Sequence, residues 1–89
     1  MAMSKQDFLI NAGLLPQTLE AWLEWEWVTP AQTSAGQTFS EGDVARAHLI
    51  QSLQVDFGVN DEGLDLILHL IDQLHGMRRA LDRLRSEVA

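Results

Sequence analysis

The chain has 89 residues, a net charge of −7 and no cysteine. A chain of this length forms one domain at most and buries only about 60 to 65% of the surface that its unfolded form exposes, so we expect self-association to add to its stability. Without cysteine there is no disulfide, no thiolate nucleophile and no cysteine metal site, and the default compartment is the reducing cytoplasm. Residues 1–5 lack the apolar core of a signal peptide, and polar residues interrupt the most apolar stretch, 64–74, so no membrane association is expected.

The charges are distributed unevenly along the chain. Eleven acidic residues precede position 73, against only Lys5 and Arg46, whereas residues 73–89 hold four arginines against Asp82 and Glu87. The sequence therefore predicts that residues 1–72 are acidic and that residues 73–89 are slightly basic.

Two short helices with a tight connection are predicted first. Ser4 followed by Asp7 is an N-cap pattern, so a first helix is expected over about 5–12, ended by Gly13. Pro16 suits the first turn of a second helix, expected over about 17–26, and Pro30 prevents its continuation. Two helices joined by about three residues indicate a helix-turn-helix, in which the second helix is the candidate recognition element.

A small hairpin and a third helix follow. Residues 27–40 are rich in Thr, Pro, Gln, Ser, Ala and Gly, and the turn at 34–36 predicts a short β hairpin, or wing. Ser40 and Asp43 repeat the cap pattern and predict a third helix that runs to about Asp56 and is ended by Gly58.

A long fourth helix is predicted to begin at Asn60 or Asp61 and to run to the C-terminus, over about 26 residues and about 39 Å. Apolar residues recur along it at alternating spacings of three and four, the heptad pattern of a coiled coil. We call this stripe the seam: Ile67, Leu70, Leu74, Met77, Leu81, Leu84 and Val88. The seam predicts a homodimer formed by helix pairing. The alternative is that the helix folds back on its own domain, because its first half has the further apolar residues Leu64, Leu66, Leu68 and Ile71.

This succession of elements resembles the head of a MerR-family regulator over nearly the whole chain. The resemblance is carried by Val28-Thr29-Pro30 after the second helix, by the Gly-containing wing, and by residues 38–44 at the entry to the third helix; Leu19, Trp22, Trp27 and Val28 fall where that family places core residues. It implies an all-α fold with a small β wing, in one domain over 1–89. A MerR-like winged helix-turn-helix head over 4–58 would be followed by a long C-terminal helix over 60–88.

A closer resemblance lies in residues 56–72, which are similar to the CbpM-type chaperone modulators. Gly58-Val59-Asn60, then Glu62-Gly63 and a helix rich in Ile and Leu, are typical of that group, as is the short length. The short tail departs from its pattern. These small MerR-like proteins bind the J domain of a CbpA-type, DnaJ-like co-chaperone. The resemblance implies that the chain covers the basic J-domain helix that stimulates Hsp70 (DnaK), and so inhibits that stimulation.

The second helix is poorly suited to DNA. Affinity for DNA comes mainly from Lys and Arg, but residues 16–28 contain no Lys, Arg or Asn, and the wing carries no positive charge. A tryptophan beside acids instead favours a basic protein partner. The expected contact residues, which we call the recognition surface, are Glu20, Glu24, Trp25 and Glu26. A second candidate group, the junction acids, comprises Asp56, Asp61, Glu62 and Asp65.

Both groups have a purely structural interpretation as well. Trp25 would then cover the edge of the core beside solvated glutamates, while Asp61 and Glu62 would only complement the helix dipole. Two functions therefore remain open. One is a chaperone modulator that binds a J domain, and the other is a dimeric MerR-like DNA regulator whose basic tail compensates for its acidic helix.

No catalytic or cofactor site is predicted. No hydroxyl nucleophile has a base nearby, the sequence has no Gly-rich phosphate-binding loop, and the carboxylates are scattered over several helix faces. The chain is therefore not expected to be an enzyme. His48, His69 and His75 lack metal-ligand spacing. The arginines between 78 and 85 alternate with the seam and are expected to form flanking ion pairs rather than a nucleic-acid patch.

Overall fold

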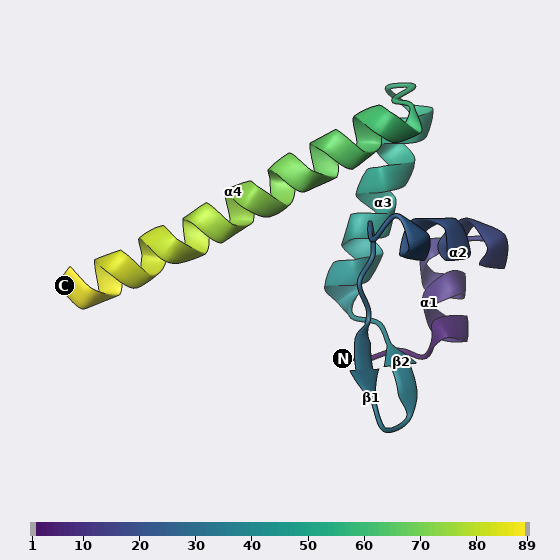
Figure 1. The fold of residues 1–89 in the computed structure, drawn as a ribbon. Helices are drawn as coiled ribbons and strands as arrows, with labels where there is room; N and C mark the ends of the chain where they lie inside the picture. The colour runs from purple at the N-terminus through teal and green to yellow at the C-terminus, as the bar shows by residue number, and fades with distance from the viewer. Residues whose placement is uncertain (1, 89) are drawn as a thin grey trace. The chain divides into compact units, whose positions relative to one another are not determined.

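A computed structural model describes residues 2–88 of the chain. The elements are, in chain order, α1 (Lys5–Ala12), α2 (Pro16–Glu24), β1 (Ala31–Thr33), β2 (Gly36–Thr38), α3 (Glu41–Val55) and α4 (Asp61–Val88) (Figure 1). The chain divides into two compact units, of which the first, here called the head, ends at Val59 and the second begins at Asn60. The predicted fold, mostly helical with a small β wing and a long C-terminal helix, is confirmed.

The first two helices form the predicted helix-turn-helix. The Ser4 hydroxyl accepts a hydrogen bond from the Asp7 N–H at 3.2 Å and caps α1, as the sequence indicates. Gly13 ends α1 in the left-handed conformation, with φ of 69°, a region that glycine enters without steric cost. Pro16 is the first residue of α2, where its missing N–H is not needed.

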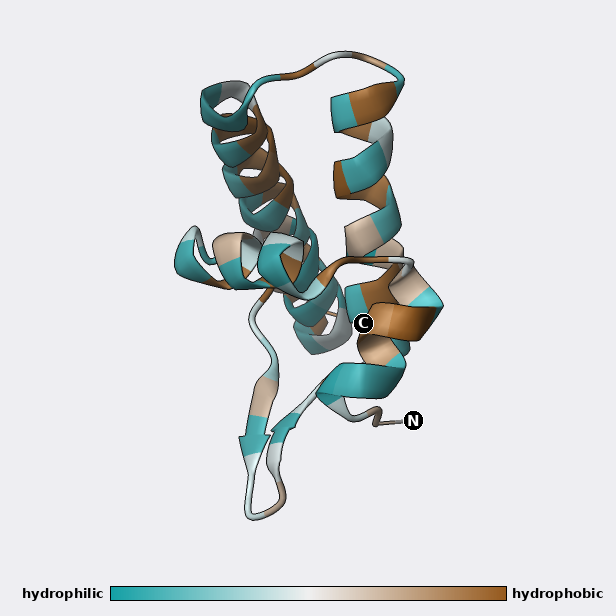
Figure 2. Cartoon of the chain, turned by 90° about the vertical axis from the view of Figure 1, so that its right-hand side faces the viewer, coloured by the Kyte–Doolittle hydropathy of each residue, from teal (hydrophilic) through white to brown (hydrophobic). Residues whose placement is uncertain are grey.

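The wing and α3 follow as expected. β1 pairs antiparallel with β2, with Ala31 opposite Thr38 and Thr33 opposite Gly36. In Figure 2 the strongest hydrophobic colour lies on the helices and the segments that connect them, whereas the wing is pale or hydrophilic. Ser40 and Asp43 form a capping box at the start of α3, with N···O distances of 2.9 and 3.2 Å, which fixes where the helix begins.

The core of the head is built around two phenylalanines from distant parts of the sequence. The rings of Phe8 on α1 and Phe39 after β2 stack with centroids 4.4 Å apart, and both are almost fully buried. Phe39 also exchanges backbone hydrogen bonds with Met3, at 2.7 and 2.8 Å, so the N-terminal segment pairs with the end of the wing. Leu19, Trp22, Trp27 and Val28, the residues that the family resemblance places in the core, are all buried.

The second unit is the single helix α4. The Asn60 side chain accepts a hydrogen bond from the Gly63 N–H at 2.8 Å, which caps the helix as predicted. Its buried residues are Leu64 and Leu68. None of the helices in residues 2–88 combines the length and hydropathy needed to cross a bilayer.

Candidate functional site

Helix α2 stands in the position of a recognition helix, and its two sides differ in character. Leu19 and Trp22 are 0 and 3% exposed, so this side belongs to the core of the head. Glu20 and Glu24 lie on the exposed side. The side of α2 that faces solvent is therefore negatively charged, as the helical projection of the sequence predicts.

Both cations of the head are engaged by other residues of the head. Lys5 on α1 forms an ion pair with Glu20, through its Nζ and Oε1 atoms. The Nε of Arg46 on α3 donates a hydrogen bond to the backbone carbonyl of Trp27. Because α2 and the wing contain no Lys or Arg of their own, the two elements that usually contact DNA lack the charge that attracts phosphate.

Helix α2 ends two residues earlier than the sequence predicts. Glu26 has φ of 61° and is the one non-glycine residue with positive φ in residues 2–88. The Trp27 N–H bonds to the Trp22 carbonyl at 2.9 Å and the Glu26 N–H to the Leu23 carbonyl at 3.1 Å, the pattern of a Schellman cap. The position that such a cap usually gives to glycine is held here by glutamate, at a cost of about 1 kcal/mol.

This left-handed turn brings two tryptophans together. Residues two apart on a continuous helix do not face each other, yet the Trp25 and Trp27 ring centroids are 5.3 Å apart, with the rings tilted by 36°. Trp25 is 43% exposed, whereas Trp27 is 3% exposed. An exposed indole thus lies against a buried one, in the chain between the exposed Glu24 and Glu26.

The junction acids are all exposed and are divided between the two units, with Asp56 in the head and Asp61, Glu62 and Asp65 in α4. Asp56 ends α3 in the head, and the Asp56 N–H bonds to the Ser52 carbonyl at 2.8 Å. Asp61 and Glu62 occupy the first turn of α4, where carboxylates complement the helix dipole. Their position therefore agrees with the structural interpretation without testing the binding one.

The seam forms an exposed apolar stripe on α4. Ile67 is half-buried, but every later seam residue from Leu70 to Val88 is between 51 and 87% exposed. Leu64 and Leu68, on another stripe of the same helix, are almost fully buried. A row of exposed leucines of this length is typical of a surface that pairs with another chain.

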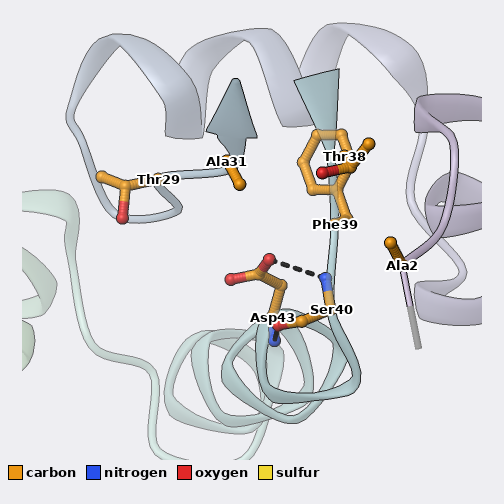
Figure 3. Close-up of a pocket in the computed structure, with 7 residues that line it drawn as sticks. All are labelled: Ala2, Thr29, Ala31, Thr38, Phe39, Ser40 and Asp43. Atoms are coloured by element: carbon orange, nitrogen blue, oxygen red, sulfur yellow. Dashed lines mark hydrogen bonds between the residues drawn. The ribbon is translucent and has the colours of Figure 1, made fainter. Parts of the chain in front are cut away.

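A cavity of about 410 Å³ lies between the wing and the start of α3 (Figure 3). Its lining residues are Ala2, Thr29, Ala31, Thr38, Phe39, Ser40 and Asp43. The dashed line in Figure 3 is the hydrogen bond from the Ser40 N–H to the Asp43 carboxylate, part of the capping box of α3. These polar groups already bond to each other, so the cavity supports no ligand assignment. Within residues 2–88, no three His, Asp or Glu side chains gather as a metal site.

Two contacts of Trp27, next to the recognition surface, have no signal in the sequence. The Trp25–Trp27 contact depends on the left-handed turn at Glu26, and glutamate gives no sequence signal for that conformation. The bond from Arg46 to the Trp27 carbonyl joins residues 19 positions apart. Pro30 disfavours a helical conformation at the residue before it, so it indicates that α2 ends before Thr29 but not that it ends at Glu24.

Comparisons with known proteins agree with this architecture. The family model described as MerR HTH family regulatory protein matches residues 3–86, which include all the elements of the head and nearly all of α4. No curated protein and no solved structure matches the chain. The chain belongs to the MerR helix-turn-helix family of regulatory proteins.

Proposed function

We propose that this protein is a chaperone modulator that binds the J domain of a CbpA/DnaJ-type co-chaperone through the recognition surface. The observation that carries the proposal is that α2 contains no cation and that Glu24, its last residue, and Trp25, which follows it, are both exposed to solvent. The likeness of residues 56–72 to CbpM-type modulators supports the same partner.

The mechanism is competition for a basic helix. J domains use such a helix to stimulate Hsp70, and the acidic recognition surface has the opposite charge. Trp25 supplies an apolar anchor among the acids, a common arrangement at binding hot spots. While this protein covers the basic helix, Hsp70 has no access to it, and the co-chaperone is restrained. The junction acids are the second candidate contact.

Calorimetry with an isolated J domain tests this proposal. Glu20→Lys combined with Glu24→Lys replaces attraction with repulsion, and we expect an affinity loss of about tenfold or more, together with weaker binding at higher salt. Asp82→Lys with Glu87→Lys makes the same change in net charge on α4 and serves as the matched control. Equal affinity of the double variant and the control would move the contact to the junction acids. No binding by the unmodified protein would refute the proposed function.

DNA regulation by a dimer is the second candidate, favoured only by the four arginines of α4 between positions 78 and 85. A gel shift with random-sequence duplex at low salt separates the two functions. We expect no shift at micromolar protein, because α2 and the wing offer phosphate no positive charge. A shift that vanishes when these arginines become glutamine would favour DNA instead.

We further propose that the protein acts as a homodimer paired through the seam. The exposed, heptad-spaced residues from Leu70 to Val88 support this proposal, since pairing would remove them from water. Sedimentation should give about twice the chain mass of 10.0 kDa. A monomer at high concentration would contradict the dimer while leaving the J-domain proposal open.

A further inference from the structure

We infer that the exposed face of Trp25 is a docking site for an arginine side chain of the partner, with Glu24 and Glu26 completing the contact. This inference deepens the proposed function, on which its choice of partner rests. It concerns the chemistry of a single contact: a planar guanidinium that stacks on the indole. It distinguishes arginine from lysine, which a general attraction between acidic and basic surfaces does not.

The indole is held in place before any partner arrives. The Trp25 ring lies against the Trp27 ring, with centroids 5.3 Å apart. Trp27 is itself fixed, because it is 3% exposed, its N–H bonds to the Trp22 carbonyl and its own carbonyl accepts from Arg46. A ring supported in this way loses little freedom on binding, which lowers the entropic cost of docking.

The exposed Trp25 ring lies in an acidic stretch of the chain. The Trp25 indole is 43% exposed, so much of its surface is open to a partner. The face of tryptophan attracts cations more strongly than that of any other side chain. The residues before and after it in the chain are exposed glutamates. Both the ring and its neighbours are therefore complementary to a positive charge, and the two carboxylates would repel an acidic partner.

The cations of the head do not occupy this position. Lys5 pairs with Glu20, one turn before Glu24, and Arg46 bonds to the backbone of Trp27. Within residues 2–88, no ion pair to Glu24 or Glu26 is found. The carboxylates beside Trp25 thus remain available to a cation from another protein.

Guanidinium fits this surface better than ammonium. It is planar, so it stacks on an indole, and it is more weakly hydrated, so less water must be removed. Its fixed fork of N–H donors can bond a carboxylate while the plane lies on the ring. A lysine has the same charge but makes no planar stack.

The first experiment uses short peptides as probes and needs no J domain. The full-length, isotope-labelled protein is titrated with tetra-arginine and with tetra-lysine while the indole N–H resonances are followed by NMR. We expect arginine to bind about threefold or more tightly than lysine, with the Trp25 indole shifted most, and the preference to vanish in Trp25→Leu. Equal binding of the two peptides, or a preference that persists in Trp25→Leu, would overturn the inference.

The second experiment places the contact in the proposed complex. Trp25→Leu is expected to weaken J-domain binding about tenfold and Trp25→Phe less, because phenylalanine keeps a weaker π face. Replacing the arginines of the J domain's basic helix with lysine should weaken binding to the native protein but not to Trp25→Leu. Ile10→Ala, at an exposed apolar position on α1, is the control, and circular dichroism checks that each variant folds.

The two experiments separate the inference from the proposed function. If the J domain binds and Trp25→Leu retains native affinity, the arginine site is wrong and the proposed function stands. If no J domain binds but the arginine peptide shifts the Trp25 indole, the proposed function fails and the arginine site stands.

Discussion

The head and α4 use apolar residues in opposite ways. The head buries Phe8, Leu19 and Phe39 to 1% exposure or less, in a core formed by residues from separate helices and the end of the wing. In α4, which has 28 residues, Leu64 and Leu68 are buried while the seam residues from Leu70 onward are more than half exposed. The head thus has the buried core of a complete domain. In contrast, α4 exposes an apolar stripe of the kind found on one helix of a helix–helix interface.

The largest expected effect tests whether the head is complete in itself. Phe39→Ala removes a fully buried ring that stacks on Phe8, so we expect the free energy of unfolding of the head to fall by about 3 to 5 kcal/mol. Urea denaturation followed by circular dichroism measures it. Ile10→Ala, at a position that is 73% exposed, should cost far less. Similar losses in the two variants would mean that the core does not hold the head together.

The next effect tests whether α4 is one half of an interface. Leu74→Asp with Leu81→Asp places charges within the seam, and we expect dimer affinity to fall about a hundredfold, or about 2.7 kcal/mol. Sedimentation equilibrium measures the change. His75→Asp with Ser86→Asp adds the same charge to exposed positions outside the seam and should leave the dimer intact. A dimer that survives the seam substitutions would show that another surface pairs the chains.

The smallest expected effect is on stability and concerns the ends of two helices within the head. Gly13 and Glu26 both have positive φ, of 69 and 61°, but only glycine adopts this conformation without strain. Glu26→Gly should therefore stabilise the protein by about 1 kcal/mol, while Gly13→Ala, which meets no steric clash, should destabilise it by about the same amount.

Thermal unfolding of both variants gives the sign of each effect. For the recognition surface, the informative result is a Glu26→Gly variant that is more stable and binds the J domain more weakly. That combination would mean that glutamate is kept for binding at the expense of stability. A variant that is no more stable than the native protein would contradict the strain assigned to Glu26.

The sequence specifies the element boundaries well where caps mark them. Ser4, Gly13, Ser40 and Asn60 locate the ends of helices through local hydrogen bonds and backbone preferences, and the structure agrees at each. The end of α2 was predicted two residues late, because Glu26 carries no signal for a left-handed turn. The end of a helix can be predicted from the local sequence where the residue that ends it is one commonly found there, such as Gly13.

The site was predictable in its charge but not in its arrangement. Helical periodicity is enough to place Glu20 and Glu24 opposite the core. It does not reveal that Lys5, 15 residues earlier, pairs with Glu20, or that Trp25 rests on Trp27. These contacts depend on the packing of the helices in the head, which pairs residues that no local pattern connects.

The contact between Trp25 and Trp27 has an optical consequence. All three tryptophans lie within six positions, and two of them are 3% exposed whereas Trp25 is 43% exposed. The solvent-sensitive, longer-wavelength part of the emission should therefore come mainly from Trp25, and its closeness to Trp27 should give a near-ultraviolet dichroic signal. Covering Trp25 would shift the emission to shorter wavelength, so the native chain reports occupancy of this surface without any added dye.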